Sequence, residues 1–175
     1  QGVIGHKVGA VAKMLGAVDA LDIMAAIELA ADDDEVDTII LDIDSPGGTV
    51  AGVPELAETV EAVQASGTKK IYAYTDSQMA SAAYWLAAGA NGIFAAPSAA
   101  GFPGVALDEE VRKHLQTEVM ETYNEFAGFV SKFRPGLNYE HLQGQTFTGR
   151  RAAEIGMIDG EAKSLDILLQ KLGKA

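Results

Sequence analysis

Two short segments of the chain carry residues that could catalyse acyl transfer. Residues 41–49 read Leu-Asp-Ile-Asp-Ser-Pro-Gly-Gly-Thr, and residues 79–85 read Met-Ala-Ser-Ala-Ala-Tyr-Trp. The first predicts a glycine-rich turn after a strand, whose backbone N–H groups can approach a substrate closely. The second places the hydroxyl of Ser81 at the start of an apolar helix, where unpaired N–H groups and the helix dipole stabilise negative charge. Together they predict a serine nucleophile beside an oxyanion hole, which are the two features that acyl transfer needs.

The donors of the predicted oxyanion hole are backbone N–H groups. Ala82 could supply one of them, and Gly47 or Gly48 could supply the second. Removal of one such donor typically lowers the rate about 100- to 1000-fold. Each motif also has a structural interpretation, because serine is a common helix N-cap and Ser-Pro-Gly-Gly is a common turn. Their combination with a third segment, residues 148–159, favours catalysis, although that segment alone predicts only a packing motif made of a capped helix and a short strand.

The order of the predicted elements indicates how these motifs are positioned. Apolar runs of strand length followed by turn residues occur at 38–43, 70–74 and 93–95. Helical patterns occur at 22–31, 54–66, 80–90, 108–133, 149–156 and 165–172. Because strands and helices alternate, we expect a parallel sheet with flanking helices and right-handed crossovers in a single α/β domain over residues 1–175. The N-terminus resembles the end of a strand that begins outside this chain.

The composition excludes several classes of function. The chain has 175 residues and a formal net charge of -12, and an acidic surface repels phosphate backbones, so we expect no nucleic acid partner. The absence of cysteine excludes disulfides, thiolate catalysis and cysteine metal sites. No apolar run approaches the roughly 20 residues that span a bilayer. The N-terminus also lacks the features of a signal peptide. We therefore expect a soluble chain.

Histidine and acidic residues are weaker candidates for catalysis. His6, His114 and His141 could each form a dyad with a serine, but a surface histidine is the commoner interpretation. Asp42 and Asp44 alternate on the strand that ends at the glycine-rich turn, where they could orient a base or simply end a hydrogen-bonded strand. No group of histidine and acidic residues has metal-ligand spacing. We expect neither a metal nor a cofactor.

The three segments, in this order, resemble the serine peptidase family of signal peptide peptidase A and the phage prohead proteases. That family is related to the Clp protease subunit and shares its crotonase-like fold. In the family an Asp-Ser-Pro-Gly-Gly turn contributes to the oxyanion hole, which matches residues 44–48, and the nucleophile motif matches Ser81 and the four residues after it. The family's Gly-Val segment is altered here at 101–105, and its Thr-Gly-x-x-Ala segment matches 148–159. The alanines that follow Ser81 look more like the phage branch.

The chain departs from this family at the general base. In the family a lysine takes the serine proton, a role that suits lysine when burial lowers its pKa toward neutrality. That lysine is expected between the Gly-Val segment and the long helix, but here Leu107 runs directly into Asp108 and the stretch is absent. The nearest lysine, Lys113, falls inside the helical pattern and is not nominated. The general base is therefore unknown.

Three explanations of this departure are open. The stretch belongs to the natural protein but is missing from this sequence, or a neighbouring subunit supplies the base, although an identical protomer would lack it too. In the third explanation the chain is a degenerate, inactive homologue. We favour the first, because the helix that begins at Asp108 matches the family's downstream helix well and the register resumes after the gap.

The resemblance implies a serine endopeptidase that assembles into a homo-oligomer enclosing its active sites. It also implies peptide or protein substrates with small or apolar residues near the cut, such as scaffold or portal-associated proteins during capsid maturation, and a location in the bacterial cytoplasm or a phage prohead. The alternatives are a bacterial signal peptide peptidase, which normally carries a membrane anchor, and a crotonase-type acyl-CoA enzyme, which needs no serine nucleophile. A further alternative is a catalytically inactive structural module of a capsid or membrane assembly.

Overall fold

A four-stranded parallel sheet forms the centre of the fold. The computed structural model spans residues 1–175 and describes all of them except 100–108, 143–144 and 174–175. The strands lie in the order β3, β4, β5, β6 and each neighbouring pair is parallel. They are β3 (Thr38–Asp42), β4 (Lys70–Thr75), β5 (Gly92–Ala95) and β6 (Gly160–Glu161). The parallel sheet expected from the alternation of strands and helices is confirmed, and chain order is kept across it.

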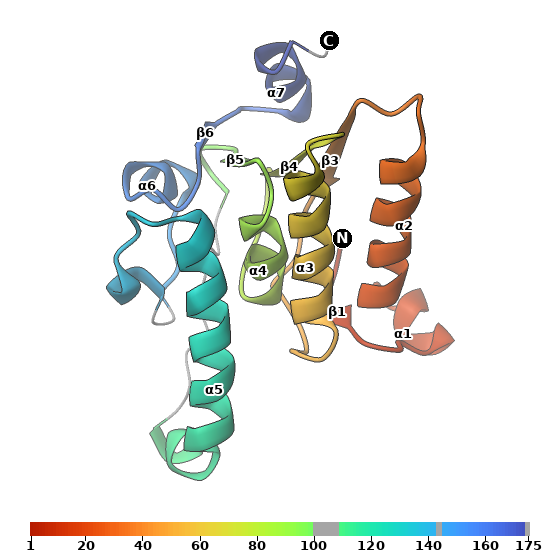
Figure 1. Ribbon diagram of the computed structural model, residues 1–175. Coiled ribbons are helices and arrows are strands. Elements are labelled where there is room, and N and C mark those ends of the chain that lie inside the picture. Colours follow the sequence, from red (N-terminus) through yellow and green to blue (C-terminus); the bar gives the residue numbers. More distant parts are fainter. Residues whose placement is uncertain (100–108, 143–144, 174–175) are drawn as a thin grey trace.

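Four helices follow one another across the sheet in the order α2, α3, α4, α5 (Figure 1). Their bounds are α2 (Ala20–Asp32), α3 (Val53–Ser66), α4 (Ala82–Ala88) and α5 (Glu109–Phe133). The later part of the chain adds a 3-10 helix (Tyr139–Leu142), α6 (Gly149–Glu154) and α7 (Leu165–Lys171). Every residue of α4 is buried, as its apolar sequence predicts, and Trp85 packs against Phe126 of α5 with ring centroids 5.7 Å apart. No helix in the described part of the chain is both long and apolar enough to cross a membrane.

The N-terminal region forms a small two-stranded sheet beside the main one. Its strands are β1 (Ile4–Gly5) and β2 (Val18–Asp19), which pair in parallel and flank α1 (Ala10–Met14). The sequence patterns indicated the strand end at β1 but not α1 or β2. A two-residue strand and a five-residue helix are too short to show a period of 2 or 3.6 residues.

The central helix α4 is shorter than the helix predicted over 80–90. It begins at Ala82, because Ser81 has φ 52° and ψ -123°, well outside the helical region. It ends at Ala88, where Gly89 is the C-cap. Most other predicted elements differ from the observed ones by one or two residues at their ends, as helix and strand boundaries usually do.

The buried carboxylate of Asp19 joins α2 to the turn that follows β1. It caps α2 by accepting from the N–H of Leu21 at 3.1 Å. It also accepts from the N–H groups of Lys7 and Val8 at 3.2 and 2.6 Å. Burial by itself would raise the pKa of Asp19, but these three hydrogen bonds, with help from the charge of Lys13, hold it below its ordinary value.

The lowered pKa of Asp19 predicts a pH-dependent contribution to stability. Its ionised form stabilises the folded chain above the unfolded-state pKa of about 4, and this contribution is lost as the pH falls through the lower folded-state pKa. We expect Asp19→Asn to lower the free energy of unfolding at pH 7, with the difference from the wild type shrinking below pH 4. Urea denaturation of both proteins at pH 7 and at a pH below 4 measures this difference. Asp34→Asn, at an exposed position, is the matched control, and an equal loss in both variants would contradict the prediction.

Candidate active site

The two chemical motifs meet where the β3–β4 pairing continues past the ends of the strands. Ser45 and Met79 form an isolated parallel bridge. The N–H of Ser45 donates to the carbonyl of Gln78 at 2.8 Å, and the N–H of Ala80 donates to the carbonyl of Ser45 at 3.1 Å. Because the carboxyl ends of parallel strands share one edge of a sheet, the glycine-rich turn and the start of α4 are brought side by side.

Gly47 is in direct contact with the candidate nucleophile. Its φ is 101°, and a Cβ added there would lie 2.6 Å from the Cβ of Ser81 and 2.8 Å from the carbonyl oxygen of Ala80. The same added atom would lie 3.0 Å from the backbone nitrogen of Ala82. Both the backbone conformation and the close approach therefore require glycine at this position.

The backbone and hydroxyl of Ser81 distinguish it from a helix cap. Thr148 and Ser164 occupy the same position before α6 and α7, and each side chain accepts from a backbone N–H of its helix at 3.3 Å. The side chain of Ser81 makes no such hydrogen bond, and its φ of 52° is one of two positive values among non-glycine residues that the structure describes. Such a conformation costs about 1–3 kcal/mol and clusters at functional sites. The capping interpretation of Ser81 does not hold.

Within the described ranges, the backbone N–H groups of Gly48, in the glycine-rich turn, and of Ala82, directly after Ser81, have no hydrogen-bond partner. The N–H of Gly47 is engaged, because it donates to the hydroxyl of Ser45 at 3.1 Å. The carbonyl of Ser81 accepts from the N–H groups of Tyr84 and Trp85, both at 3.0 Å. The carbonyl of Ser81 thus takes part in the first turn of α4. The N–H of Ala82, the first residue of the helix, is free to bind a ligand.

The opposite side of the glycine-rich turn is held by β1. The N–H of Ile4 donates to the carbonyl of Gly47 at 2.8 Å, and the N–H of Thr49 donates to the carbonyl of Ile4 at 2.9 Å. A Cβ at Gly48 would lie 1.7 Å from that same carbonyl oxygen of Ile4. The turn is therefore fixed between β1 on one side and Ser81 on the other.

Residues 148–159 form hydrogen bonds with α4 and β5, which agrees with their interpretation as a packing motif. The hydroxyl of Tyr84 donates to the carbonyl of Met157 at 2.6 Å, and complete burial raises the pKa of Tyr84 far above its ordinary value. One carboxylate oxygen of Asp159 accepts from the N–H of Ile93 at 2.7 Å. The other lies 2.7 Å from the guanidinium of Arg134, at the end of α5. These contacts tie α4, the helix that directly follows Ser81, to the rest of the sheet.

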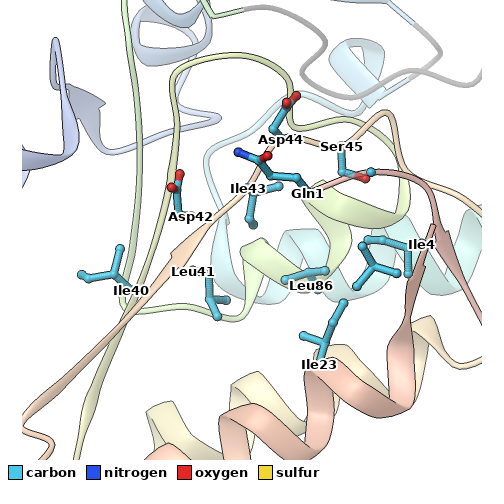
Figure 2. A pocket seen from close by; sticks show the side chains of 12 residues that line it. Gln1, Ile4, Ile23, Ile40, Leu41, Asp42, Ile43, Asp44, Ser45 and Leu86 are labelled. Carbon is cyan, nitrogen blue, oxygen red and sulfur yellow. The ribbon is translucent and has the colours of Figure 1, made fainter. Parts of the chain in front are cut away.

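The other predicted candidates do not gather at Ser81. Asp42 and Asp44 border a cavity of about 240 Å³ at the end of β3, whose other walls include Ile4, Ile23 and Leu86 (Figure 2). Burial raises the pKa of Asp42, and the charges of Asp76 and Asp44 add to the shift. The cavity lining does not include Ser81.

The histidines are also separate from Ser81 as far as the structure describes them. The ring of His6 lies against the backbone of Gly52, where an added Cβ would be 2.7 Å from Nδ1. The ring of His141 meets Phe147 edge-on with centroids 5.7 Å apart, and its Nδ1 is buried without a partner in the described residues. His114 belongs to α5. No hydrogen bond joins a histidine to Ser81 within the described ranges.

The expected place of the general base, between Leu107 and Asp108, lies outside the described residues, and so does the altered segment 101–105. Lys113 falls within α5. In the parts of the chain that are described, no three histidine, aspartate or glutamate side chains are grouped so that they could hold a metal ion. The geometry therefore brings the candidate nucleophile Ser81 against Gly47 and the unpaired N–H of Ala82.

Comparison with known proteins identifies relatives that are named as proteases. MJ0651 of Methanocaldococcus jannaschii is 26% identical over 174 residues, covering 78% of this chain and 55% of that protein. SohB of Haemophilus influenzae is 26% identical, with 86% and 52% covered. Capsid assembly protease C of Escherichia phage lambda is 27% identical, with 83% and 41% covered. The chain spans about half the length of the curated relatives it matches. No protein-family model matches it.

Comparison of folds identifies the architecture. A ClpP1 mutant from Listeria monocytogenes superimposes with a TM-score of 0.67 at 16% identity, covering 95% of this chain and 91% of that one. The chain thus has the Clp protease-like, crotonase-like α/β fold expected from its motifs. Its resemblance to the family of signal peptide peptidase A and the phage prohead proteases is confirmed by these relatives.

Proposed function

We propose that this chain is the peptidase domain, over residues 1–175, of a serine endopeptidase of the signal peptide peptidase A and phage prohead protease type. The observation that carries the proposal is the state of Ser81: a strained, uncapped residue at a helix N-terminus, in contact with Gly47 of a glycine-rich turn. The names of the relatives support proteolysis as the reaction class. An N-cap serine or an ordinary turn would need neither the strain nor the contact.

In the proposed reaction Ser81 attacks the scissile carbonyl carbon. Its hydroxyl oxygen forms a bond to that carbon while the proton passes to the general base, and the carbonyl oxygen becomes an oxyanion. The N–H groups of Ala82 and Gly48 stabilise that charge, and Gly47 lines the site by backbone contact. Collapse of the intermediate transfers the proton to the leaving amine and gives an acyl-serine, which water then hydrolyses.

The general base in this proposal is a lysine that the sequence lacks between Leu107 and Asp108. A neutral amine is a suitable base once burial has lowered its pKa toward neutrality. The expected lysine would belong to the natural protein but not to this sequence. An inactive structural homologue in a capsid or membrane assembly is the second candidate function, and the absence of that stretch is the observation that favours it.

The proposal extends to partners and location through the relatives. We expect a homo-oligomer that encloses its active sites and acts on peptides with small or apolar residues near the cut. The name of the lambda protein, a capsid assembly protease, favours a prophage or phage origin and action within a prohead. The bacterial cytoplasm is the expected location in either case.

Serine-directed labelling tests the nucleophile. Treatment of the purified chain with a fluorophosphonate should add one phosphonyl group, which peptide mass mapping should place on Ser81 rather than on Ser164, the ordinary helix cap. An intact mass several kilodaltons above 18.3 kDa, with the extra residues mapped between Leu107 and Asp108, would show that the stretch expected to carry the base is missing from this sequence. An unmodified Ser81 in a chain of 18.3 kDa would favour the inactive homologue instead.

A further inference from the structure

The buried hydroxyl of Ser45 fixes the peptide group that leads into Gly47. The side chain accepts from the N–H of Gly47 at 3.1 Å and donates to the carbonyl of Gly47 at 3.4 Å. Ser45 is only 3% exposed, so bulk water does not compete for its hydroxyl. A serine that bonds to the backbone two residues further on stabilises a turn. The hydroxyl therefore keeps the N–H of Gly47 from binding a ligand.

The next peptide group, between Gly47 and Gly48, is oriented by β1. The carbonyl of Gly47 points toward β1, because it accepts from the N–H of Ile4 at 2.8 Å. In a planar trans peptide the N–H points opposite to the carbonyl of the same group, and no peptide bond in the described residues is cis. The N–H of Gly48 therefore points away from β1. Ser81 lies on that side of the turn, since a Cβ at Gly47 would meet the Cβ of Ser81 at 2.6 Å.

This orientation needs restraint from outside the turn, because glycine gives the backbone unusual freedom. With glycine on both sides, the peptide group between Gly47 and Gly48 can rotate at low steric cost. A rotated group would present its carbonyl oxygen to Ser81 in place of the N–H, and an acceptor does not stabilise an oxyanion. The restraints that the structure shows are the N–H of Ile4 and the hydroxyl of Ser45. Of these two, only the hydroxyl belongs to a side chain.

We propose that Ser45 is a positioning residue of the oxyanion hole, whose hydroxyl holds the N–H of Gly47 so that the N–H of Gly48 is aimed at the oxyanion. The inference rests on the serine peptidase of the proposed function and adds the side chain that orders its glycine-rich turn. Ser45 acts through the turn and does not contact the reacting atoms. Without its hydroxyl the N–H of Gly47 has no buried partner, and no side chain holds the turn in the orientation that serves catalysis.

NMR of the full chain labelled with ¹⁵N-glycine identifies the N–H that binds the oxyanion. A peptide boronic acid is the probe: the oxygen of Ser81 bonds to boron, its proton is released, and an oxygen on boron takes the place of the oxyanion. The amide proton of Gly48 should then shift downfield, while those of Gly47 and of the distant Gly67 should change little. A larger shift at Gly47, or no shift at Gly48 in the adduct, would overturn the inference. A chain that forms no adduct would contradict the proposed function itself.

Substitution of Ser45 tests the hydroxyl directly. Ser45→Ala should slow fluorophosphonate labelling of Ser81 and lower kcat by about 100-fold, as when one oxyanion donor is lost, with KM for the peptide unchanged. Ser45→Cys keeps the size of the side chain but is a weak hydrogen-bonding group, so it should be equally slow, whereas Ser45→Thr keeps a hydroxyl and should restore most of the rate.

Ser66→Ala is the matched control for these variants. The hydroxyl of Ser66 accepts from the N–H of Thr68, two residues further on, at 3.3 Å, at the end of α3. Its removal should leave the labelling of Ser81 unchanged. Folded Ser45→Ala and Ser45→Cys proteins that label at the wild-type rate would overturn the inference. So would a loss that appears only in KM, since an oxyanion donor acts on kcat.

Discussion

Ser81→Ala should abolish peptide hydrolysis, lowering kcat by roughly 10⁴- to 10⁶-fold, the range seen when a serine nucleophile is removed. The alanine variant retains the backbone of the oxyanion hole but has no oxygen to form the acyl intermediate. The loss should appear in kcat, measured with a fluorogenic peptide that carries small or apolar residues at the cut. The fold should be retained, because the hydroxyl of Ser81 makes no hydrogen bond in the described structure that the substitution would remove.

Ser164→Ala is the matched control for this experiment. Ser164 also precedes a helix, and its hydroxyl accepts from the N–H of Ile167 at 3.3 Å. Its loss should therefore cost about 1 kcal/mol of stability and leave kcat unchanged. Two results would contradict the role of Ser81: peptide hydrolysis by Ser81→Ala at the wild-type rate, or an acyl-CoA activity that survives the substitution. The second result would favour a crotonase-type enzyme, whose chemistry needs the oxyanion donors but no serine.

Gly47→Ala should be the more damaging of two matched glycine substitutions. Gly47 and Gly67 both have positive φ, 101° and 67°, so an alanine at either position carries a backbone cost of about 1–2 kcal/mol. At Gly67 the new Cβ has nothing within 4 Å, whereas at Gly47 it lies 2.6 Å from the Cβ of Ser81. The clash adds about 1–3 kcal/mol, in the range for overpacking a tight site.

Urea denaturation of the two variants separates the free-energy cost of the Cβ clash from the cost of placing alanine at a positive φ. The free energy of unfolding should fall by about 1–2 kcal/mol for Gly67→Ala and by a total of about 2–5 kcal/mol for Gly47→Ala. Any Gly47→Ala protein that folds should also label more slowly at Ser81, because relief of the clash moves the turn away from the nucleophile. Equal losses of stability in the two variants would show that the contact between Gly47 and Ser81 is not tight in solution.

The elements near the site were largely predictable because their signals are local. The strands β3 and β4 follow from runs of β-branched and apolar residues, and α3 follows from its helical spacing with a glycine just after its end. Burial of α4 follows from its apolar sequence. By contrast, α1 and β2 were not predicted, since the five-residue helix and the two-residue strand each span fewer than two periods of their own pattern.

The sequence by itself determined the chemical groups: a serine before an apolar helix, a glycine-rich turn after a strand, and no lysine between Leu107 and Asp108, where the family resemblance led us to expect a base. The tertiary structure alone decided that Gly47 touches Ser81, that the Gly47 N–H is taken by Ser45, and that Ser81 does not cap its helix. The physical reason is that these features depend on the pairing of Ser45 with Met79, a long-range contact. Local propensity favours a serine that caps its helix, whereas in the folded chain the bridge between Ser45 and Met79 brings the glycine-rich turn against Ser81.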